Sequence, residues 1–300
     1  MSRKKKCIIF TDVDLDGAMA YLLFSWFKGH DVQYITVRAA DFHDSFYQWT
    51  QKVDPKIYDQ IYILDLDVSQ TSVDLVDMDN VVIIDHHLTH VHNKHKYTNA
   101  KVFVREHTSC ARLIYELLHK KSKTALTDAH KHLILLVDDY DSYTLQLKYS
   151  YELNLLFWNY QGDKLKKFVT DFRDGFTGFT DDHKKIISFH KKKINKYVSQ
   201  LQLYGANIPI NGNYYKFVST FADKYINDIA DYILREGKAE VGMVINLESN
   251  KVSIRKQKGV NLDLSDLAKK LLDGGGHSYA SGGKITEKFT TFSKLFEPIK

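Results

Sequence analysis

Short apolar segments alternate with helical patterns in the first half of this chain, and this alternation constrains the fold more than any other feature. Residues 7–10 (CIIF), 61–64 (IYIL) and 81–84 (VVII) are apolar runs of strand length. Residues 32–37 form another strand-like run, and residues 17–27 have the spacing of a helix. Strands that alternate with helices predict an α/β fold with a doubly wound, mostly parallel sheet.

Acidic residues directly follow several of these predicted strands. In an open α/β sheet, ligands bind beyond the carboxyl ends of the strands, so acids from neighbouring strands meet at one edge. Several carboxylates with an imidazole suit Mn²⁺ or Mg²⁺ better than Zn²⁺, which prefers more nitrogen and sulfur ligands. The polar residues that follow the strands are Asp12, Asp14, Asp16, Asp65, Asp67, Asp85, His86 and His87.

The segment at residues 12–17, Asp-Val-Asp-Leu-Asp-Gly, carries alternate carboxylates. Like charges this close repel one another unless a cation neutralises them. Gly17 allows a tight turn into a helix whose N-terminus can lie near a phosphate. An EF-hand loop is excluded because Leu23 stands where that motif requires glutamate. Taken alone, the segment is compatible with either a solvated acidic loop or a cation site.

A further acidic group, at residues 138–141, ends a very apolar helical stretch. Carboxylates at a helix C-terminus interact unfavourably with the helix dipole, so another interaction must compensate. Binding of a second metal ion would be such an interaction. Within this group Asp139 is the predicted ligand, and Asp138 and Asp141 have no assigned role. His90 and His92, beyond the third strand end, are predicted to be ordinary loop histidines.

Strands return in the second half of the chain. Apolar residues recur at helical spacing from Asp181 onward, which predicts a long connecting helix. Beyond Gly205 the strand pattern resumes, and a helix at residues 264–272 is predicted to stop at Gly274. The chain is therefore predicted to contain an N-terminal domain at residues 1–180, a helical linker at 181–205, and a smaller C-terminal α/β domain at 206–300.

The composition is that of a globular protein, with 44% hydrophobic and 26% charged residues in a chain of 300. Cys7 and Cys110 cannot build a disulfide framework and fit a reducing compartment. No signal-type or membrane-spanning apolar segment is evident, so we expect a soluble cytoplasmic protein without a membrane partner. The net charge of +5 permits a polyanionic partner without requiring one.

In chain order, these segments resemble the motifs of the DHH phosphoesterase superfamily, which is named after the sequence that stands here as Asp85-His86-His87. The C-terminal half resembles the DHH-associated domain of that family, and the resemblance spans nearly the whole chain. The matching segments are residues 12–17, Asp65, residues 85–87, Asp139, residues 252–255 and residues 274–282.

The resemblance implies a phosphodiesterase with two Mn²⁺ ions bridged by Asp65, or with Mg²⁺ in their place. Two neighbouring cations can activate water as a nucleophile and stabilise charge on the phosphoryl oxygens. Asp65, Asp85 and His87 would take part in catalysis. Many members have a histidine where Phe10 stands here, and Asp12 could serve as a ligand instead. The implied metal ligands are Asp12, Asp14, Asp16, Asp65, His86 and Asp139.

For substrate binding, the resemblance points to the C-terminal half. Arg255 is suited to bidentate contact with a phosphate. Gly274, Gly275 and Gly276 would let the backbone approach a ligand closely, although a helix cap and turn explains such a run equally well. His277 would contact the terminal phosphate or the sugar of the substrate.

The implied activity is hydrolysis of short single-stranded oligonucleotides or dinucleotides to mononucleotides. The longer exonucleases of this superfamily usually carry an additional oligonucleotide-binding domain, and we expect none within these 300 residues. Two alternatives stay open: a pyrophosphatase or polyphosphatase that uses the same metals, and a non-catalytic, nucleic-acid-binding scaffold of the DHH type. A homodimer is compatible with the sequence.

Overall fold

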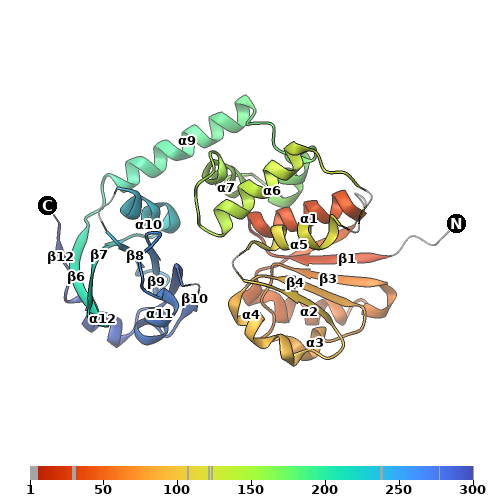
Figure 1. The fold of residues 1–300 in the computed structure, drawn as a ribbon, viewed down its shortest axis with the longest axis horizontal. Helices are drawn as coiled ribbons and strands as arrows, with labels where there is room; N and C mark the ends of the chain where they lie inside the picture. Colours follow the sequence, from red (N-terminus) through yellow and green to blue (C-terminus); the bar gives the residue numbers. More distant parts are fainter. Residues whose placement is uncertain are drawn as a thin grey trace. The chain divides into compact units, whose positions relative to one another are not determined.

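The computed structural model describes residues 6–28, 32–106, 108–120, 122, 124–236, 239–276 and 278–299. The chain divides into two compact units, Met1–Ile187 and Ser188–Lys300, and each has a sheet of its own (Figure 1). The division falls within the long helix α9 (Asp181–Val198). The predicted α/β fold is confirmed.

The sheet of the first unit has five parallel strands in the order β2-β1-β3-β4-β5. The order reverses between β1 and β3, which is the arrangement of a doubly wound sheet. The prediction of a parallel sheet is therefore confirmed, although the edge strand β5 was not predicted. The strands are β1 (Cys7–Thr11), β2 (Gln33–Thr36), β3 (Gln60–Leu64), β4 (Val81–Asp85) and β5 (Lys101–Val104).

Helices cover both faces of this sheet, with α1 and α5 on one side and α2, α3 and α4 on the other (Figure 1). Further helices, α6 to α8, pack around α1. The helices are α1 (Leu15–Lys28), α2 (Phe42–Thr50), α3 (Val73–Val76), α4 (Leu88–Asn93), α5 (Cys110–Leu118), α6 (Asp128–Asp141), α7 (Ser150–Trp158) and α8 (Lys164–Phe172), with short 3-10 turns at Ala39–Asp41, Pro55–Ile57 and Lys94–Lys96.

Burial on both faces explains why the central strands are apolar at nearly every position. Alternate residues such as Phe10 and Ile63 belong to the core shared with α2 and α3. Their neighbours face α1, where the rings of Phe24 and Tyr62 lie 4.5 Å apart. Each fully buried side chain of this size contributes about 1.5–3 kcal/mol. The sheet is therefore a rigid support for the loops at its carboxyl edge.

Asp77, at the end of α3, ties this helix to the segment before β5. Its carboxylate accepts hydrogen bonds from the backbone N–H groups of Thr98 (3.1 Å), Asn99 (2.7 Å) and Ala100 (2.7 Å). Burial works against the charge, but these hydrogen bonds lower the pKa of Asp77 to about 2. Because folding lowers its pKa, the ionised Asp77 carboxylate stabilises the fold at pH values above the ordinary carboxyl pKa. This contribution is lost as the pH falls toward 2.

Replacing Asp77 with alanine is therefore expected to lower the free energy of unfolding at pH 7 by about 0.5–1.5 kcal/mol, because the N–H groups of Thr98, Asn99 and Ala100 lose a charged acceptor. Urea denaturation measures this change. Asp79→Ala is the matched control, since Asp79 is an exposed carboxylate two residues further on. Equal stability of the two variants would show that the Asp77 hydrogen bonds contribute nothing.

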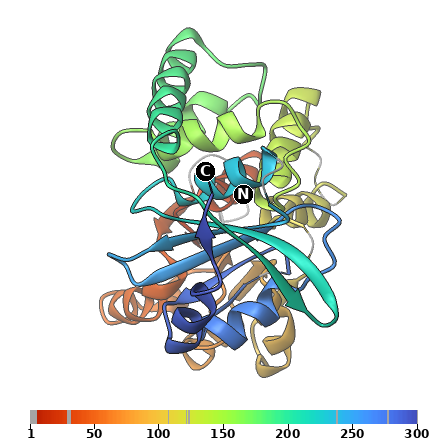
Figure 2. The same ribbon diagram turned by 90° about the vertical axis from the view of Figure 1, so that its left-hand side faces the viewer.

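The second unit contains a mixed sheet in the order β10-β11-β9-β8-β7-β6-β12, in which β7 and β8 are parallel and the other pairs antiparallel. The long pair β6 and β7 is drawn in teal in Figure 2. The strands are β6 (Tyr204–Ile210), β7 (Asn213–Phe221), β8 (Val241–Asn246), β9 (Lys251–Lys256), β10 (Gly275–Gly276), β11 (Ala280–Lys284) and β12 (Glu297–Pro298).

Helices cover the second sheet on both faces. Val241, Met243 and Ile254 share a core with α11 (Leu264–Leu272) and α12 (Glu287–Ser293). The alternate position Gly242 faces α10 (Ile226–Arg235), where a Cβ would lie 3.3 Å from the Ile233 side chain. Within the described part of the chain, no helix has the length and apolar character needed to cross a bilayer.

Candidate active site

The carboxyl ends of β1, β3 and β4 bring the predicted acids to one edge of the first sheet. In the parallel register Thr11 pairs with Leu64, and Leu64 pairs with Ile84. The residues that follow these strands therefore leave the sheet side by side. This is the edge where ligands bind in doubly wound folds.

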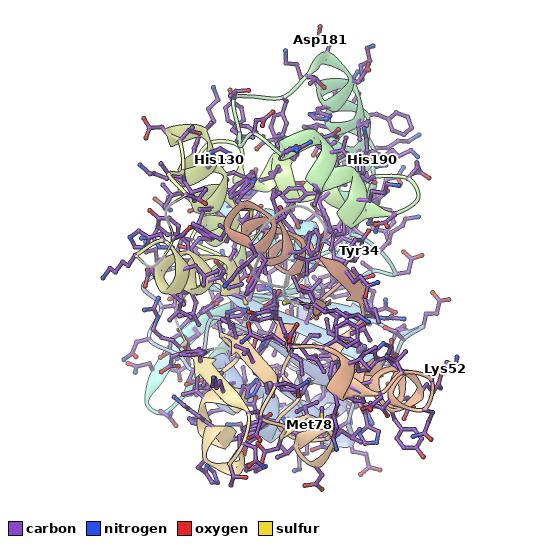
Figure 3. The ribbon with its side chains drawn as sticks, turned by 90° about the vertical axis from the view of Figure 1, so that its right-hand side faces the viewer. Tyr34, Lys52, Met78, His130, Asp181 and His190 are labelled. Atoms are coloured by element: carbon purple, nitrogen blue, oxygen red, sulfur yellow. The ribbon has the colours of Figure 1, made fainter. Side chains whose placement is uncertain are left out.

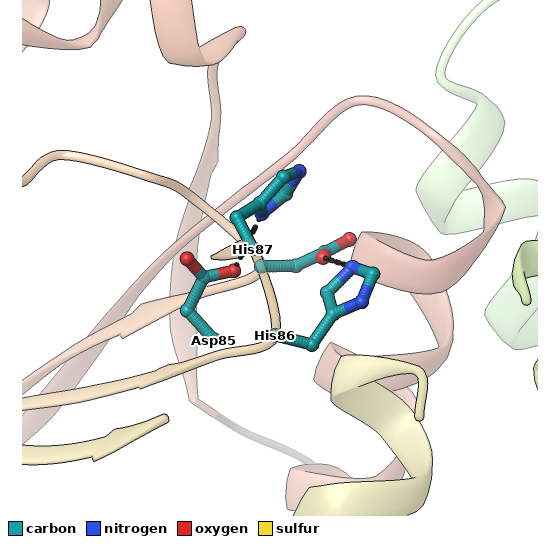
Figure 4. A group of neighbouring side chains, drawn as sticks. Asp85, His86 and His87 are labelled. Atoms are coloured by element: carbon teal, nitrogen blue, oxygen red, sulfur yellow. Dashed lines mark hydrogen bonds and ion pairs between the residues drawn. The ribbon is translucent and has the colours of Figure 1, made fainter. Parts of the chain in front are cut away.

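His86 lies at the centre of this edge. Its Nε2 atom lies 3.2 Å from Asp65 Oδ1, 3.6 Å from Asp141 Oδ2 and 3.9 Å from Asp16 Oδ2. These carboxylates come from three different elements: the end of β3, the last turn of α6 and the first turn of α1. Figure 4 shows the His86 ring on the side of the segment away from Asp85, and its centre lies 4.7 Å from that of the His87 ring. The ligand atoms of Asp16, His86 and Asp141 lie within 4.8 Å of one another.

Asp65 is held in a costly backbone conformation. Its φ is +58°, in the left-handed region, while its N–H donates to the carbonyl oxygen of Ile84 at 3.0 Å. A non-glycine residue pays about 1–3 kcal/mol for such a conformation, which persists where the surrounding structure enforces it. The side chain is buried against His86, so the neighbouring strand fixes both its backbone and its carboxylate.

The structure brings Asp141 to this cluster and does not bring Asp139 there. Asp139 accepts hydrogen bonds from the Thr144 hydroxyl (2.5 Å) and the Gln146 N–H (2.8 Å) at Oδ1, and from the Leu147 N–H (3.0 Å) at Oδ2. Its pKa is lowered, because hydrogen bonds from the Ser150 side chain and this turn outweigh burial. Asp139 therefore holds the turn that follows α6.

Residues two apart on an α-helix point about 200° apart, so Asp139 and Asp141 cannot both face the same site. Asp141 continues the buried face of Ile134 and Val137, at helical spacings of seven and four. Asp139 also lies at helical spacing from a buried residue, Leu136, so the sequence pattern alone does not choose between the two aspartates. Among the described residues, Asp141 Oδ2 has no hydrogen-bond partner although it is buried.

Asp16 has a second contact besides His86. Its Oδ2 accepts a hydrogen bond from the N–H of Cys110 (2.7 Å) and its Oδ1 from the N–H of Ala111 (3.0 Å). It thereby pairs free N–H groups of the first turn of α5, where a helix favours negative charge. Burial, and then the charge of Asp141, nevertheless raise the pKa of Asp16 well above its ordinary value.

Asp12 and Asp14 belong to the loop that leads into α1. Asp14 Oδ1 accepts from the Gly17 N–H at 2.9 Å. A Cβ at Gly17 would lie 2.5 Å from the Asp12 carbonyl oxygen, so only glycine fits there. Burial and the charge of Asp14 raise the pKa of Asp12 to about 7. Neither carboxylate joins the tight His86 cluster within the described part of the chain.

Asp85 orients two histidines. Its Oδ1 lies 2.8 Å from His87 Nδ1, and its Oδ2 lies 2.8 Å from His90 Nδ1 (Figure 4 shows the first contact). Asp85 is fully buried, yet these histidines keep its pKa well below the ordinary value. Burial disfavours a charged His87, but the Asp85 carboxylate raises the pKa of His87 to about 10. In the metal-free protein this raised pKa favours the cationic form of His87, of whose side chain 38% is exposed.

The prediction of an ordinary loop histidine was wrong for His90. The residue lies in α4 and is fully buried. Its Nδ1 contacts Asp85, and its Nε2 has no hydrogen-bond partner among the described residues. The helix α4 is too short to show a periodic pattern in the sequence, so only the folded chain reveals this contact. His92, on the same helix, is exposed.

The predicted substrate-binding residues lie in the second unit. Arg255, on β9, donates to Asn227 Oδ1 and to the Ile254 carbonyl oxygen, each at 3.0 Å. A Cβ at Gly274 would lie 2.0 Å from the Gly282 carbonyl oxygen, so close chain packing requires that glycine.

The remaining residues of this group adjoin the end of α11. Gly276 has φ +136°, and a Cβ there would lie 2.6 Å from the Ala280 carbonyl oxygen. Nothing lies within 4 Å of a Cβ at Gly275. The predicted stop at Gly274 was one residue late, since Asp273 in the left-handed conformation caps α11. His277 lies outside the described residues.

The donor set of the first unit fits a divalent cation. Burial, and then neighbouring carboxylates, raise the pKa of Asp65 well above its ordinary value, and burial and Asp14 raise that of Asp141 to about 8. Buried acids this close repel one another unless protons or cations neutralise them. The unpartnered Asp141 oxygen beside His86 offers a ligand atom for such a cation. Carboxylate oxygens with one imidazole suit Mn²⁺ or Mg²⁺.

These raised pKa values predict how pH acts on the metal-free protein. The folded chain retains protons that the unfolded chain releases above about pH 4. The contribution of these groups to stability is therefore present at low pH and is lost as the pH rises through about 7 to 8, the pKa values of Asp12 and Asp141. Mn²⁺ replaces the protons, so its stabilising effect should be larger at pH 8 than at pH 6.

Thermal unfolding with Mn²⁺ or with EDTA, across this pH range, measures the effect as the gain in Tm. The same series on His86→Ala is the control, because that variant lacks the central imidazole. A gain in Tm that does not change with pH in the unmodified protein would contradict the prediction.

No protein-family model matches the chain, and neither does any curated protein. Several solved structures are similar over nearly its whole length. The pGpG-specific phosphodiesterase PggH from Vibrio cholerae has a TM-score of 0.58 and 15% identity, covering 97% of this chain and 96% of that chain. An exopolyphosphatase-related protein from Bacteroides fragilis has a TM-score of 0.55 and 15% identity, covering 97% and 91%.

The exonuclease RecJ bound to manganese has a TM-score of 0.54 and 13% identity, covering 97% of this chain and 88% of that chain. At these identities the similarity establishes the fold. The chain therefore shares its fold with this phosphodiesterase, this exopolyphosphatase-related protein and this exonuclease.

Proposed function

We propose that this protein is a divalent-metal-dependent phosphodiesterase that hydrolyses short single-stranded oligonucleotides or dinucleotides to mononucleotides. One observation carries the proposal: His86 Nε2 lies within 4 Å of carboxylate oxygens from three separate elements of the first unit. A buried group of acids around one imidazole has little structural purpose without a cation.

Each side chain of the edge has a part in this proposal. Bound cations would supply an activated water and neutralise charge on the phosphoryl oxygens. Asp85 would keep the His87 ring oriented, and the positive charge of His87 would attract the phosphate of the substrate. The residues that would hold the cations are Asp12, Asp14, Asp16, Asp65, His86 and Asp141, with Asp141 in the place first assigned to Asp139.

The substrate class rests on more general support. A phosphodiesterase and an exonuclease are among the proteins with this fold, and the net charge of +5 suits a polyanion. Arg255, Gly274, Gly275, Gly276 and His277 would contribute phosphate contacts from the C-terminal domain. The similarity to an exopolyphosphatase-related protein keeps polyphosphate hydrolysis as the second candidate.

A substrate panel with Mn²⁺ tests the proposal. It should contain RNA and DNA of two to five nucleotides, linear and cyclic dinucleotides, pyrophosphate and polyphosphate. Release of mononucleotides from the short oligonucleotides or dinucleotides, abolished by EDTA, is the expected result. Release of phosphate from polyphosphate alone would favour the second candidate. No hydrolysis, together with no bound metal in elemental analysis, would favour a scaffold.

A further inference from the structure

A pocket of about 470 Å³ adjoins the acidic loop of the first unit. Asp12 and Asp14 form part of its wall, so the pocket and the proposed metal site share these two carboxylates. Other residues of the lining have no part in metal binding. They include Thr36 at the end of β2, Arg38 just after it, and Phe157, Trp158 and Lys164 around the connection from α7 to α8.

Trp158 is the notable side chain of this wall. It ends α7, and 44% of its surface is exposed. The ammonium group of Lys164 lies 4.4 Å from the centre of the Trp158 ring. The buried ring of Phe157 meets Trp158 edge-on, with 5.8 Å between ring centres. The indole therefore has firm support although it contributes little to the core.

The loop between α7 and α8 is tied to the sheet. Asp163 Oδ2 accepts a hydrogen bond from the Tyr34 hydroxyl at 2.9 Å, and Asp163 Oδ1 accepts one from the Lys166 N–H at 2.9 Å. Tyr34 lies on the edge strand β2 and is labelled in Figure 3. These contacts hold the beginning of α8, and with it Lys164, in place before any ligand arrives.

We infer that this pocket binds a nucleobase of the substrate, with Trp158 as the stacking surface. The inference rests on the proposed function and deepens it. Every nucleobase has an aromatic face that stacks on tryptophan, and the pocket is lined by an exposed indole next to the acidic loop.

The position of the pocket agrees with the structure of a nucleotide. In a nucleotide only one sugar separates the base from its phosphate. If the phosphate lies at the acidic edge, its base therefore lies close to that edge, where Asp12 and Asp14 border the pocket. Lys164 and Arg38 offer positive charge to the sugar-phosphate backbone, although Arg38 also pairs with Asp41 at 3.0 Å and Asp163 adds a third carboxylate to the lining. The site would therefore select phosphodiesters that carry bases, and it would gain nothing from pyrophosphate or polyphosphate.

Kinetics with a dinucleotide and its abasic analogues test the inference, with the missing base placed at either position. The measured quantity is the ratio of kcat/KM for the dinucleotide to that for the analogue. For the analogue that lacks the base bound in the pocket, Trp158→Ala is expected to lower this ratio roughly tenfold. Trp158→Phe is expected to retain most of the ratio, because phenylalanine also offers an aromatic face. An unchanged ratio in Trp158→Ala at both positions would overturn the inference.

A binding measurement without metal separates this inference from the proposed function. In EDTA, AMP is expected to quench tryptophan fluorescence in the full-length protein, whereas ribose 5-phosphate is not. The quenching should disappear in Trp158→Phe, which leaves Trp26 and Trp49 in place.

If AMP leaves the Trp158 emission unchanged, the base pocket is wrong even where the protein hydrolyses dinucleotides. If AMP quenches that emission but the panel shows no phosphodiester hydrolysis, the base pocket stands and the proposed activity fails.

Discussion

Replacing His86 with alanine is expected to lower kcat/KM for a short oligonucleotide at least about 10²-fold, the cost of losing one charge-stabilising group from a transition state. The reason is geometric. His86 Nε2 is the atom on which the carboxylates of Asp16, Asp65 and Asp141 converge. Without the imidazole, a cation at this edge loses its nitrogen ligand, so the affinity for Mn²⁺ should fall together with the rate.

Steady-state kinetics and calorimetric titration with Mn²⁺ measure the two effects of the His86 substitution. His92→Ala is the matched control, because His92 is exposed on α4 and stands apart from the cluster. If His86→Ala binds Mn²⁺ and turns over substrate like the control, the metal site has been assigned to the wrong residues.

Asp141→Asn and Asp139→Asn are expected to have opposite consequences, although the two residues are only two positions apart. Asp141→Asn should lower kcat/KM about 10²-fold or more and weaken Mn²⁺ binding, because it removes a ligand oxygen beside His86. Its effect on stability should be small or favourable. The raised pKa of Asp141, about 8, shows that burial disfavours its charge.

Asp139→Asn should instead reduce the stability of the metal-free protein by about 1.5–3 kcal/mol. Its two carboxylate oxygens accept hydrogen bonds from Thr144, Gln146 and Leu147. The amide of asparagine keeps only one acceptor oxygen, and its nitrogen is a donor, so some of these bonds are lost. Mn²⁺ affinity should be nearly retained. Denaturation in EDTA and titration with Mn²⁺ separate the two variants, and the reverse pattern would return Asp139 to the metal site.

Several elements of the fold were predictable because their sequence patterns are local. The strands β1, β3 and β4 are short, apolar and bounded by acids, and burial on both faces of a parallel sheet requires that pattern. The helix α11 shows an apolar face with helical spacing, whereas α1 is mostly apolar and is buried on every side from Leu15 to Ser25. The helix α10 also has such a face, at Ile229, Ile233 and Leu234, and could have been predicted from it.

Other elements left no comparable pattern. The edge strand β5 alternates between exposed and half-buried residues over only four positions, and β6 contains a proline. The helix α4 is less than two turns long. Such segments take their form from the neighbours they pair with or pack against, and a single sequence does not record those neighbours.

The run of glycines shows how one pattern can have two physical causes. Gly274 and Gly276 were candidates for close contact with a ligand. In the folded chain, a Cβ at either position would collide with the backbone of β11, at Gly282 and Ala280 respectively. Chain packing thus accounts for both glycines, and a role in substrate binding is an addition to that requirement.

The sequence by itself determined that parallel strands end in Asp12, Asp65 and Asp85, because apolar runs and the acids after them are consecutive in the chain. It therefore predicted a cation site at one edge of a doubly wound sheet. Tertiary structure decided which other side chains reach that edge. Asp141 is present because packing sets the rotation of α6, and His90 because the fold places α4 against Asp85. The local pattern specifies each element, whereas the orientation of one element on another depends on contacts between distant residues.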